Sequence, residues 1–78
     1  MQRFGEKLRL LRKRHAMTLM ELAEALEYGS YTRISELETG KKNPTAEFVL
    51  SVARFFNVTT DELMKDELDL DTDDAAIR

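Results

Sequence analysis

Few side chains in this sequence could carry out bond-making chemistry. The chain has no cysteine and one histidine, His15, which closes an expected helix with no Asp or second His nearby. Such a histidine is more typical of a helix C-terminal partner or a packed side chain than of a base or ligand. The sequence also lacks a nucleophile–base pair, a metal-ligand cluster and a glycine-rich phosphate loop. We therefore expect no enzyme, no catalytic residue, no metal and no cofactor.

A basic, turn-rich segment, Lys41-Lys42-Asn43-Pro44, follows Gly40. Two lysines beside the end of an expected helix suit phosphate contact by charge. Lysines in a surface loop are also ordinary, so their position in the fold must decide their role.

Two short helices joined by a tight turn must position these residues. Thr18 and Glu21 form a Thr-x-x-Glu capping box that begins the first helix. Gly29 allows the turn, Ser30 is a suitable N-cap for the second helix, and Gly40 ends that helix. The apolar residues at helical spacing within the pair are Leu22, Ala23, Leu26, Ile34 and Leu37. So short a pair cannot bury its own apolar face, and further helices must cover it.

The flanking segments predict three more helices. Residues 3–15 place Phe4, Leu8 and Leu11 on one face, and the basic residues around them are expected to form a solvated face, namely Arg3, Lys7, Arg9, Lys13 and Arg14. A fourth, mostly apolar helix begins at Pro44 or Thr45 and runs to about residue 56. A second Thr-x-x-Glu box at residues 59–62 begins a short fifth helix.

The fourth helix carries more apolar side chains than one buried face requires. Its expected core residues are Ala46, Val49, Leu50, Val52, Ala53 and Phe56. Phe48 and Phe55 exceed this face, so one of them is expected to be exposed, where it could promote self-association.

Charge divides the chain into two parts. The net charge is −3, yet residues 1–60 carry ten basic and seven acidic residues, whereas residues 61–78 carry two basic and eight acidic ones. We expect one domain over residues 1–66 and a flexible acidic tail over residues 67–78, although Leu68 and Leu70 could dock on a neighbour. No apolar run is long enough to span a membrane, and a cytoplasmic location is expected.

The ordered set of these residues resembles the Cro/CI-type (XRE) helix-turn-helix family of bacterial and phage regulators. The resemblance covers residues 4–64 and rests on Leu8, Leu11, Arg12, Met17-Thr18, Leu22-Ala23, Ser30, Ile34, Leu37-Glu38, Gly40, Pro44, Ala53, Phe56, Val58 and Asp61-Glu62-Leu63. It implies an all-α, five-helix, lambda-repressor-like DNA-binding domain whose helix-turn-helix is formed by the second and third helices.

The resemblance also implies roles for individual residues. Base readout falls to Tyr31, Thr32, Arg33, Ser35 and Glu36, at the start of a recognition helix that enters the major groove. Phosphate contacts fall to Thr18, Ser30, Lys41, Lys42 and Asn43. Arg12 and Glu38 match the family's internal ion pair, which would fix the angle of the reading helix.

Three positions depart from the family pattern. Leu19 replaces a frequent phosphate-binding Gln, Glu27 replaces the Gly that usually caps the second helix, and Ala16 replaces another frequent Gly. The segment between Ala23 and Ile34 is also one residue longer than usual, which could rotate the recognition helix.

The implied function is sequence-specific transcription regulation, as a repressor or controller protein that binds a pseudo-palindromic operator as a homodimer. The alternative is an antitoxin or adaptor that binds a protein partner, such as a toxin, through the Phe48/Phe55 surface and the acidic tail. Neither hypothesis involves a membrane.

Overall fold

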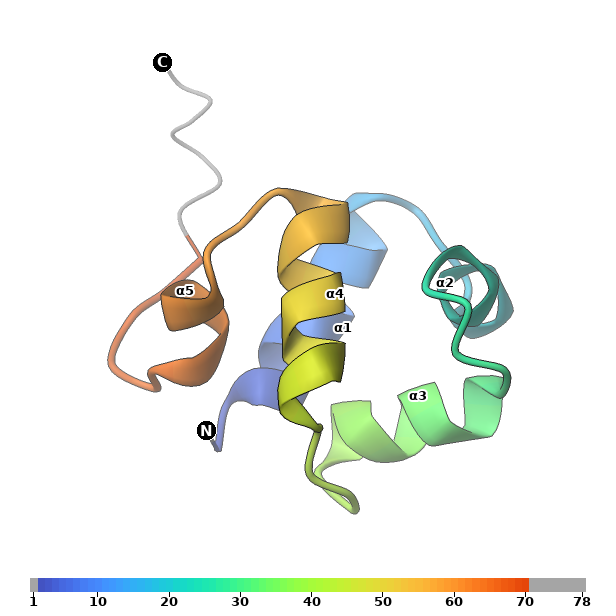
Figure 1. The fold of residues 1–78 in the computed structure, drawn as a ribbon, viewed down its shortest axis with the longest axis horizontal. Helices are drawn as coiled ribbons and strands as arrows, with labels where there is room; N and C mark the ends of the chain where they lie inside the picture. The colour runs from blue at the N-terminus through green and yellow to red at the C-terminus, as the bar shows by residue number, and fades with distance from the viewer. Residues whose placement is uncertain (1, 71–78) are drawn as a thin grey trace.

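The computed structural model describes residues 2–70, which form helices and no strand within that range. The helices are α1 (Phe4–Arg14), α2 (Leu19–Ala25), α3 (Tyr31–Thr39), α4 (Ala46–Phe56) and α5 (Thr60–Met64). In Figure 1, α1 and α4 lie in the middle, α2 lies to one side of them with α3 below it, and α5 lies on the other side. The predicted all-α, five-helix architecture is confirmed, and α2 and α3 pack against each other as the helix pair.

The helices begin where the capping residues predict. Thr18 accepts a hydrogen bond from the N–H of Glu21 at 3.0 Å, and the Glu21 carboxylate accepts the N–H of Thr18 at 2.8 Å. Thr59 and Glu62 form the same reciprocal box at the start of α5. Thr45, rather than Pro44, caps α4, because its hydroxyl accepts the N–H of Phe48. Each box satisfies two backbone N–H groups that lack a partner inside the helix.

Four of the five helices, α1 to α4, are followed by a left-handed residue, and only one of these four residues is glycine. Gly40 has φ +84° after α3, while Ala16, Glu27 and Asn57 have φ +54°, +55° and +58° after α1, α2 and α4. At Ala16 and Glu27 the following N–H groups bond back to the last helical carbonyls, which is a Schellman motif. A residue with a Cβ pays about 1–2 kcal/mol for this backbone conformation. At the three non-glycine positions, the packing of the residues that follow must offset this backbone strain.

That packing comes from the residue after each left-handed position. Met17, Tyr28 and Val58 are half-buried and lie against the core. The Tyr28 ring lies 4.6 Å from that of Phe48 between centroids. The hydrophobic contact that accompanies a Schellman motif thus ties the end of α2 to α4.

One core joins all five helices, and it contains a buried lysine. Its apolar members are Phe4, Leu8, Leu11, Leu22, Ala23, Ile34, Leu37, Phe48, Val49, Val52, Ala53, Phe56, Leu63 and Leu70. Lys7 is 1% exposed, so its expected place on a solvated face of α1 is wrong. The reason lies in its position, three residues after Phe4 and four before Leu11, which places it on the apolar stripe of α1.

The outer face of α4 corrects two further expectations. Leu50 is 42% exposed and Ala46 is also exposed, so neither belongs to the core. Phe48 is buried against Phe4 and Tyr28, whereas Phe55 is 45% exposed. Only Phe55 of the two phenylalanines can therefore contribute to an outer surface.

Residues 65–70 continue beyond α5 and pack on the body. Leu70 is buried, while Leu68 remains exposed. The division between a domain at residues 1–66 and a tail at residues 67–78 stays a prediction, since residues 71–78 lie outside the described residues. Among the described residues, no helix is both long and apolar enough to cross a membrane.

Candidate nucleic-acid interface

Helix α3 buries one edge and presents the rest outward. Ile34 and Leu37 are buried, and they hold α3 against α1 and α2. The predicted reading residues lie on the remaining surface. Tyr31, Thr32 and Arg33 are exposed, and Ser35 and Glu36 are half-buried. All five come from the first two turns of one helix, so they form one continuous polar surface that an external partner can reach.

The start of α3 leaves hydrogen-bonding groups available. Ser30 is in the N-cap position with extended backbone, but its side chain makes no capping hydrogen bond. The first N–H groups of a helix have no partner within it, and they readily donate hydrogen bonds to an external anion. A phosphate oxygen close to Ser30 could therefore bind both the hydroxyl and a backbone N–H.

The end of α3 leads into the basic turn. The N–H groups of Gly40 and Lys41 bond to the carbonyls of Leu37 and Glu36 at 3.4 and 2.9 Å, which closes α3 in a Schellman motif. Lys41, Lys42 and Asn43 follow and are all exposed. The fixed backbone turn holds two ammonium groups beside the same helix whose other end carries Tyr31.

At the start of α2, only one of two neighbouring positions suits a phosphate contact. The N–H of Thr18 is already bonded to Glu21, so its hydroxyl proton is the donor that remains. Leu19 is half-buried and packs on the core. The departure from the family's Gln is thus explained by packing, because Leu19 contributes to the core.

The ion pair between Arg12 and Glu38 is present and nearly enclosed. Arg12 Nε and Nη2 donate to the two Glu38 oxygens at 2.7 and 3.1 Å, and Nη1 donates to the Met17 carbonyl at 2.9 Å. The two side chains are 13% and 5% exposed. The hydrogen bond to Glu38, more than its charge, raises the pKa of Arg12 above its ordinary value. The pair joins α1 to the last turn of α3. Three nitrogens of the Arg12 guanidinium each donate a hydrogen bond, and together these bonds fix the plane of the group.

Gly5 allows α1 to approach α3 without a gap. A Cβ built at Gly5 would lie 2.4 Å from the Leu37 carbonyl oxygen and 2.5 Å from that of Glu38. Both distances are far inside van der Waals contact, and both atoms belong to the backbone. Any side chain at this position would therefore push the end of α3 away from α1.

The two ends of α3 differ in charge. A groove of about 550 Å³ lies at the α2–α3 turn, with Met20, Glu24 and Glu27 on one wall and Ser30 and Tyr31 on the other. The two exposed carboxylates repel phosphate, whereas the lysines at the opposite end of α3 attract it. Phosphate contact is therefore favoured at the basic turn. Residues 2–70 contain no group of three or more acidic or histidine side chains able to hold a metal ion.

Three residues that join α1 to other parts of the fold were missed by sequence reasoning. A lone glycine inside a helix, as at Gly5, indicates a close backbone approach. Lys7 lies on the apolar stripe of α1, and this position alone predicts a buried side chain. Asp66 carried no local signal, because its partners at residues 2 and 3 are more than 60 positions away.

Comparison with known proteins agrees with this geometry. A model of the helix-turn-helix domain family matches residues 3–65. The HTH-type transcriptional activator BcrR of Enterococcus faecalis is 45% identical over 64 residues, which are 82% of this chain and 31% of that protein. The chain thus spans about a third of the length of the relative. The family match contains all of α1 to α5, including the α2–α3 pair. This chain belongs to the helix-turn-helix domain family.

Proposed function

We propose that this chain is a cytoplasmic, sequence-specific DNA-binding domain that regulates transcription through α3. The observation that carries the proposal is the outward surface of α3, where Tyr31, Thr32 and Arg33 are exposed at the start and two lysines follow its end. Side chains at the start of such a helix reach base edges in the major groove, and flanking cations hold phosphates.

Each predicted reading residue can make more than one kind of DNA contact, and DNA-binding measurements can tell these contacts apart. Thr32 offers a hydroxyl or a methyl group, Glu36 can accept from cytosine N4, and Tyr31 can pack on a thymine methyl or reach a phosphate. Arg33 can bind a guanine edge or a phosphate. A base contact changes sequence preference when removed, whereas a phosphate contact weakens all sequences alike.

The test is a binding titration with duplexes selected from a random pool, followed by DNA from upstream of the protein's own gene. Affinity should fall steeply with salt, because Lys and Arg displace counterions. Lys41→Ala and Lys42→Ala should each lower the salt slope by about 1. Lys65→Ala is the matched control, since it removes an exposed lysine directly after α5, a helix that lies across the molecule from α3 in Figure 1. Saturable binding without a salt slope would contradict the mechanism.

Homodimerisation is part of the proposal. Two copies would set their recognition helices about 34 Å apart on a pseudo-palindromic operator. The outer face of α4 supports self-association, because Leu50 and Phe55 are both exposed there. Phe55→Ser should shift the sedimentation coefficient to that of a monomer and weaken binding to a two-half-site duplex more than to a single half-site. If Phe55→Ser and the unchanged protein both sediment as dimers, the dimer contact lies elsewhere.

The same exposed apolar face favours a second candidate, a protein-interaction module such as an antitoxin or adaptor. Phe48 cannot contribute, since it is buried. Deleting residues 71–78, which keeps the buried Leu70 in place, distinguishes the two candidates. Unchanged or tighter DNA binding supports the regulator, and loss of a protein partner with DNA binding intact supports the module.

The direction of regulation is a separate question. The family resemblance led us to expect a repressor, whereas the relative named above is an activator. A reporter gene placed behind the selected operator separates the two, because a repressor lowers and an activator raises its expression.

A further inference from the structure

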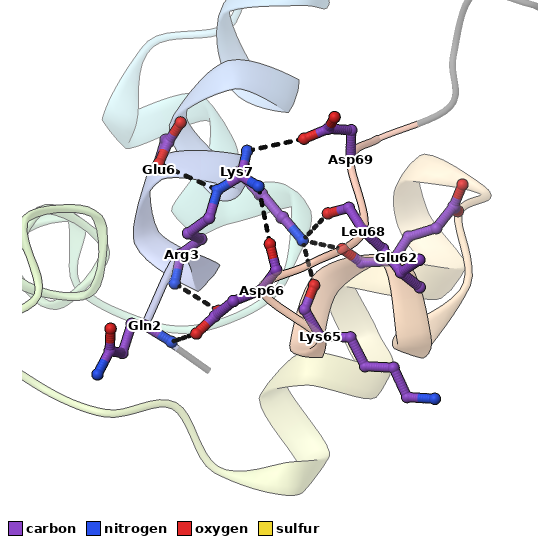
Figure 2. A network of polar contacts seen from close by, with 9 residues as sticks. All are labelled: Gln2, Arg3, Glu6, Lys7, Glu62, Lys65, Asp66, Leu68 and Asp69. Atoms are coloured by element: carbon purple, nitrogen blue, oxygen red, sulfur yellow. Dashed lines mark hydrogen bonds and ion pairs between the residues drawn. The ribbon is translucent and has the colours of Figure 1, made fainter.

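Lys7 is the most buried charged group among the described residues, and its ammonium is held by backbone carbonyl groups. Its side chain is enclosed between α1 and the chain that follows α5. The ammonium donates to the carbonyl oxygens of Glu62, of Lys65 at 2.8 Å and of Leu68 at 2.6 Å. An ammonium has three protons, so these three acceptors satisfy it completely. One side chain of α1 thus binds both the end of α5 and the segment that follows it, and holds them against α1 (Figure 2).

The same segment returns to the start of α1. The Asp66 carboxylate accepts the N–H groups of Gln2 and Arg3 at 3.0 and 2.9 Å, where the helix has no partner of its own for them. The Arg3 guanidinium donates to the Asp66 carbonyl at 2.8 Å and pairs with Asp69 at 3.0 Å. Figure 2 shows these contacts meeting around the first turn of α1. We refer to residues 65–70 as the latch.

The opposite side of α1 holds the recognition helix. Gly5 and Lys7 are two positions apart, which is about 200° around a helix, so they face in nearly opposite directions. Gly5 lies against the Leu37 and Glu38 carbonyls, and Arg12 binds the Glu38 carboxylate. The first turns of α1 therefore lie between the latch and the last turn of α3.

We infer that the latch positions α3 for DNA reading by holding α1 in place, with Lys7 and Asp66 as the positioning residues. Release of the latch would leave the start of α1 uncapped and the end of α5 without its donor. The close approach at Gly5 tolerates little movement, because backbone meets backbone there. A displaced α1 therefore moves the end of α3 and the basic turn. The inference rests on the proposed DNA-binding role of α3.

The test compares two acidic residues that stand side by side in the latch. Asp66→Ala removes the acceptor of two N–H groups, whereas Glu67→Ala removes the same charge from an exposed neighbour. Both are made in the full chain. The first readout is amide hydrogen exchange at Gly40, Lys41 and Lys42, whose N–H groups bond to the end of α3. The second is the dissociation constant for a duplex selected with the unchanged protein.

Asp66→Ala should speed exchange at these three amides and weaken DNA binding, each by at least about threefold. Glu67→Ala should change both by less than about twofold, as expected of a surface position. Asp69→Ala, which removes only an exposed pair with Arg3, should fall between them. If Asp66→Ala lowers the folded fraction, Asp66→Asn, which keeps an acceptor oxygen, serves in its place with a smaller effect of the same sign.

Two results would overturn the inference. Faster exchange confined to residues 65–70, with unchanged amides at Gly40 to Lys42, would show that the latch only stabilises its own end. Equal effects of Asp66→Ala and Glu67→Ala on DNA binding would show that the latch acts only through its net charge and not through the Asp66 hydrogen bonds. If the unchanged protein binds no DNA, the proposed function fails, and the exchange at the end of α3 still decides whether the latch reaches that helix.

Discussion

Arg12 and Glu38 join α1 to the last turn of α3 through two hydrogen bonds of 2.7 and 3.1 Å. Both side chains are largely removed from water, so each depends on the other for its hydrogen bonds. Glu38→Gln should therefore lower the free energy of unfolding by about 3–5 kcal/mol, as for a buried pair that loses one partner. Urea denaturation measures this loss. A decrease below about 1 kcal/mol would instead match an exposed ion pair.

Gly5→Ala should destabilise the protein although alanine is the better helix former. Alanine gains up to about 1 kcal/mol of helix propensity. Its Cβ would lie 2.4 Å from the Leu37 carbonyl oxygen, and relieving this overlap should cost about 1–3 kcal/mol or more. Thermal unfolding should show a lower Tm for Gly5→Ala, while the exposed neighbour Glu6→Ala should change it little. A raised Tm for Gly5→Ala would mean that α1 can move away from α3 freely.

Glu27→Gly should stabilise the protein. Glu27 adopts φ +55°, which costs a residue with a Cβ about 1–2 kcal/mol, and glycine adopts it without that cost. Part of the gain is lost to the greater freedom of glycine in the unfolded chain, so a net gain of about 0.5–1 kcal/mol is expected. Glu24→Gly, inside α2, is the control and should lose about 1 kcal/mol. Destabilisation by both changes would show that the Glu27 side chain contributes more than its backbone costs.

Acid should release the latch through Asp66. Hydrogen bonds from the N–H groups of Arg3 first and Gln2 second hold the pKa of Asp66 below its ordinary value of 3.8. Because the folded pKa is the lower one, Asp66 stabilises the fold above about pH 4, and this contribution disappears as the pH falls through the folded pKa. Urea midpoints measured from neutral to acid pH should therefore fall less steeply for Asp66→Asn than for the unchanged chain. Glu67→Gln should keep the original slope, and parallel curves for all three proteins would contradict a role for Asp66.

Local features of this fold could be predicted because their partners are close in sequence. The two Thr-x-x-Glu boxes and the Gly40 end involve residues at most five apart, and all formed as predicted. The architecture also followed, since apolar spacing marks each helix. Leu50 was misassigned because a helix with excess apolar residues does not reveal which of them face outward.

The contacts that join distant segments could not be predicted in this way. Lys7 was assigned to solvent because lysine usually lies there, and its carbonyl partners are 55 to 61 positions away. The acidic composition of residues 67–78 indicated a flexible tail and left open whether Leu68 or Leu70 docks; Leu70 is buried, and Asp66 binds the start of α1. The Arg12–Glu38 pair came from the family resemblance, and the assignment of base and phosphate contacts on α3 stays a prediction until DNA binding is measured.

The position of the latch also affects how the domain can be labelled. In Figure 1 the chain that follows α5 lies on the other side of α1 and α4 from α2 and α3, and the Gln2 N–H donates to the Asp66 carboxylate. A fluorescent protein or affinity tag joined after the latch should therefore lie away from α3. The same tag joined ahead of Gln2 would crowd the start of α1, so imaging and pull-down reagents for this domain belong after the latch.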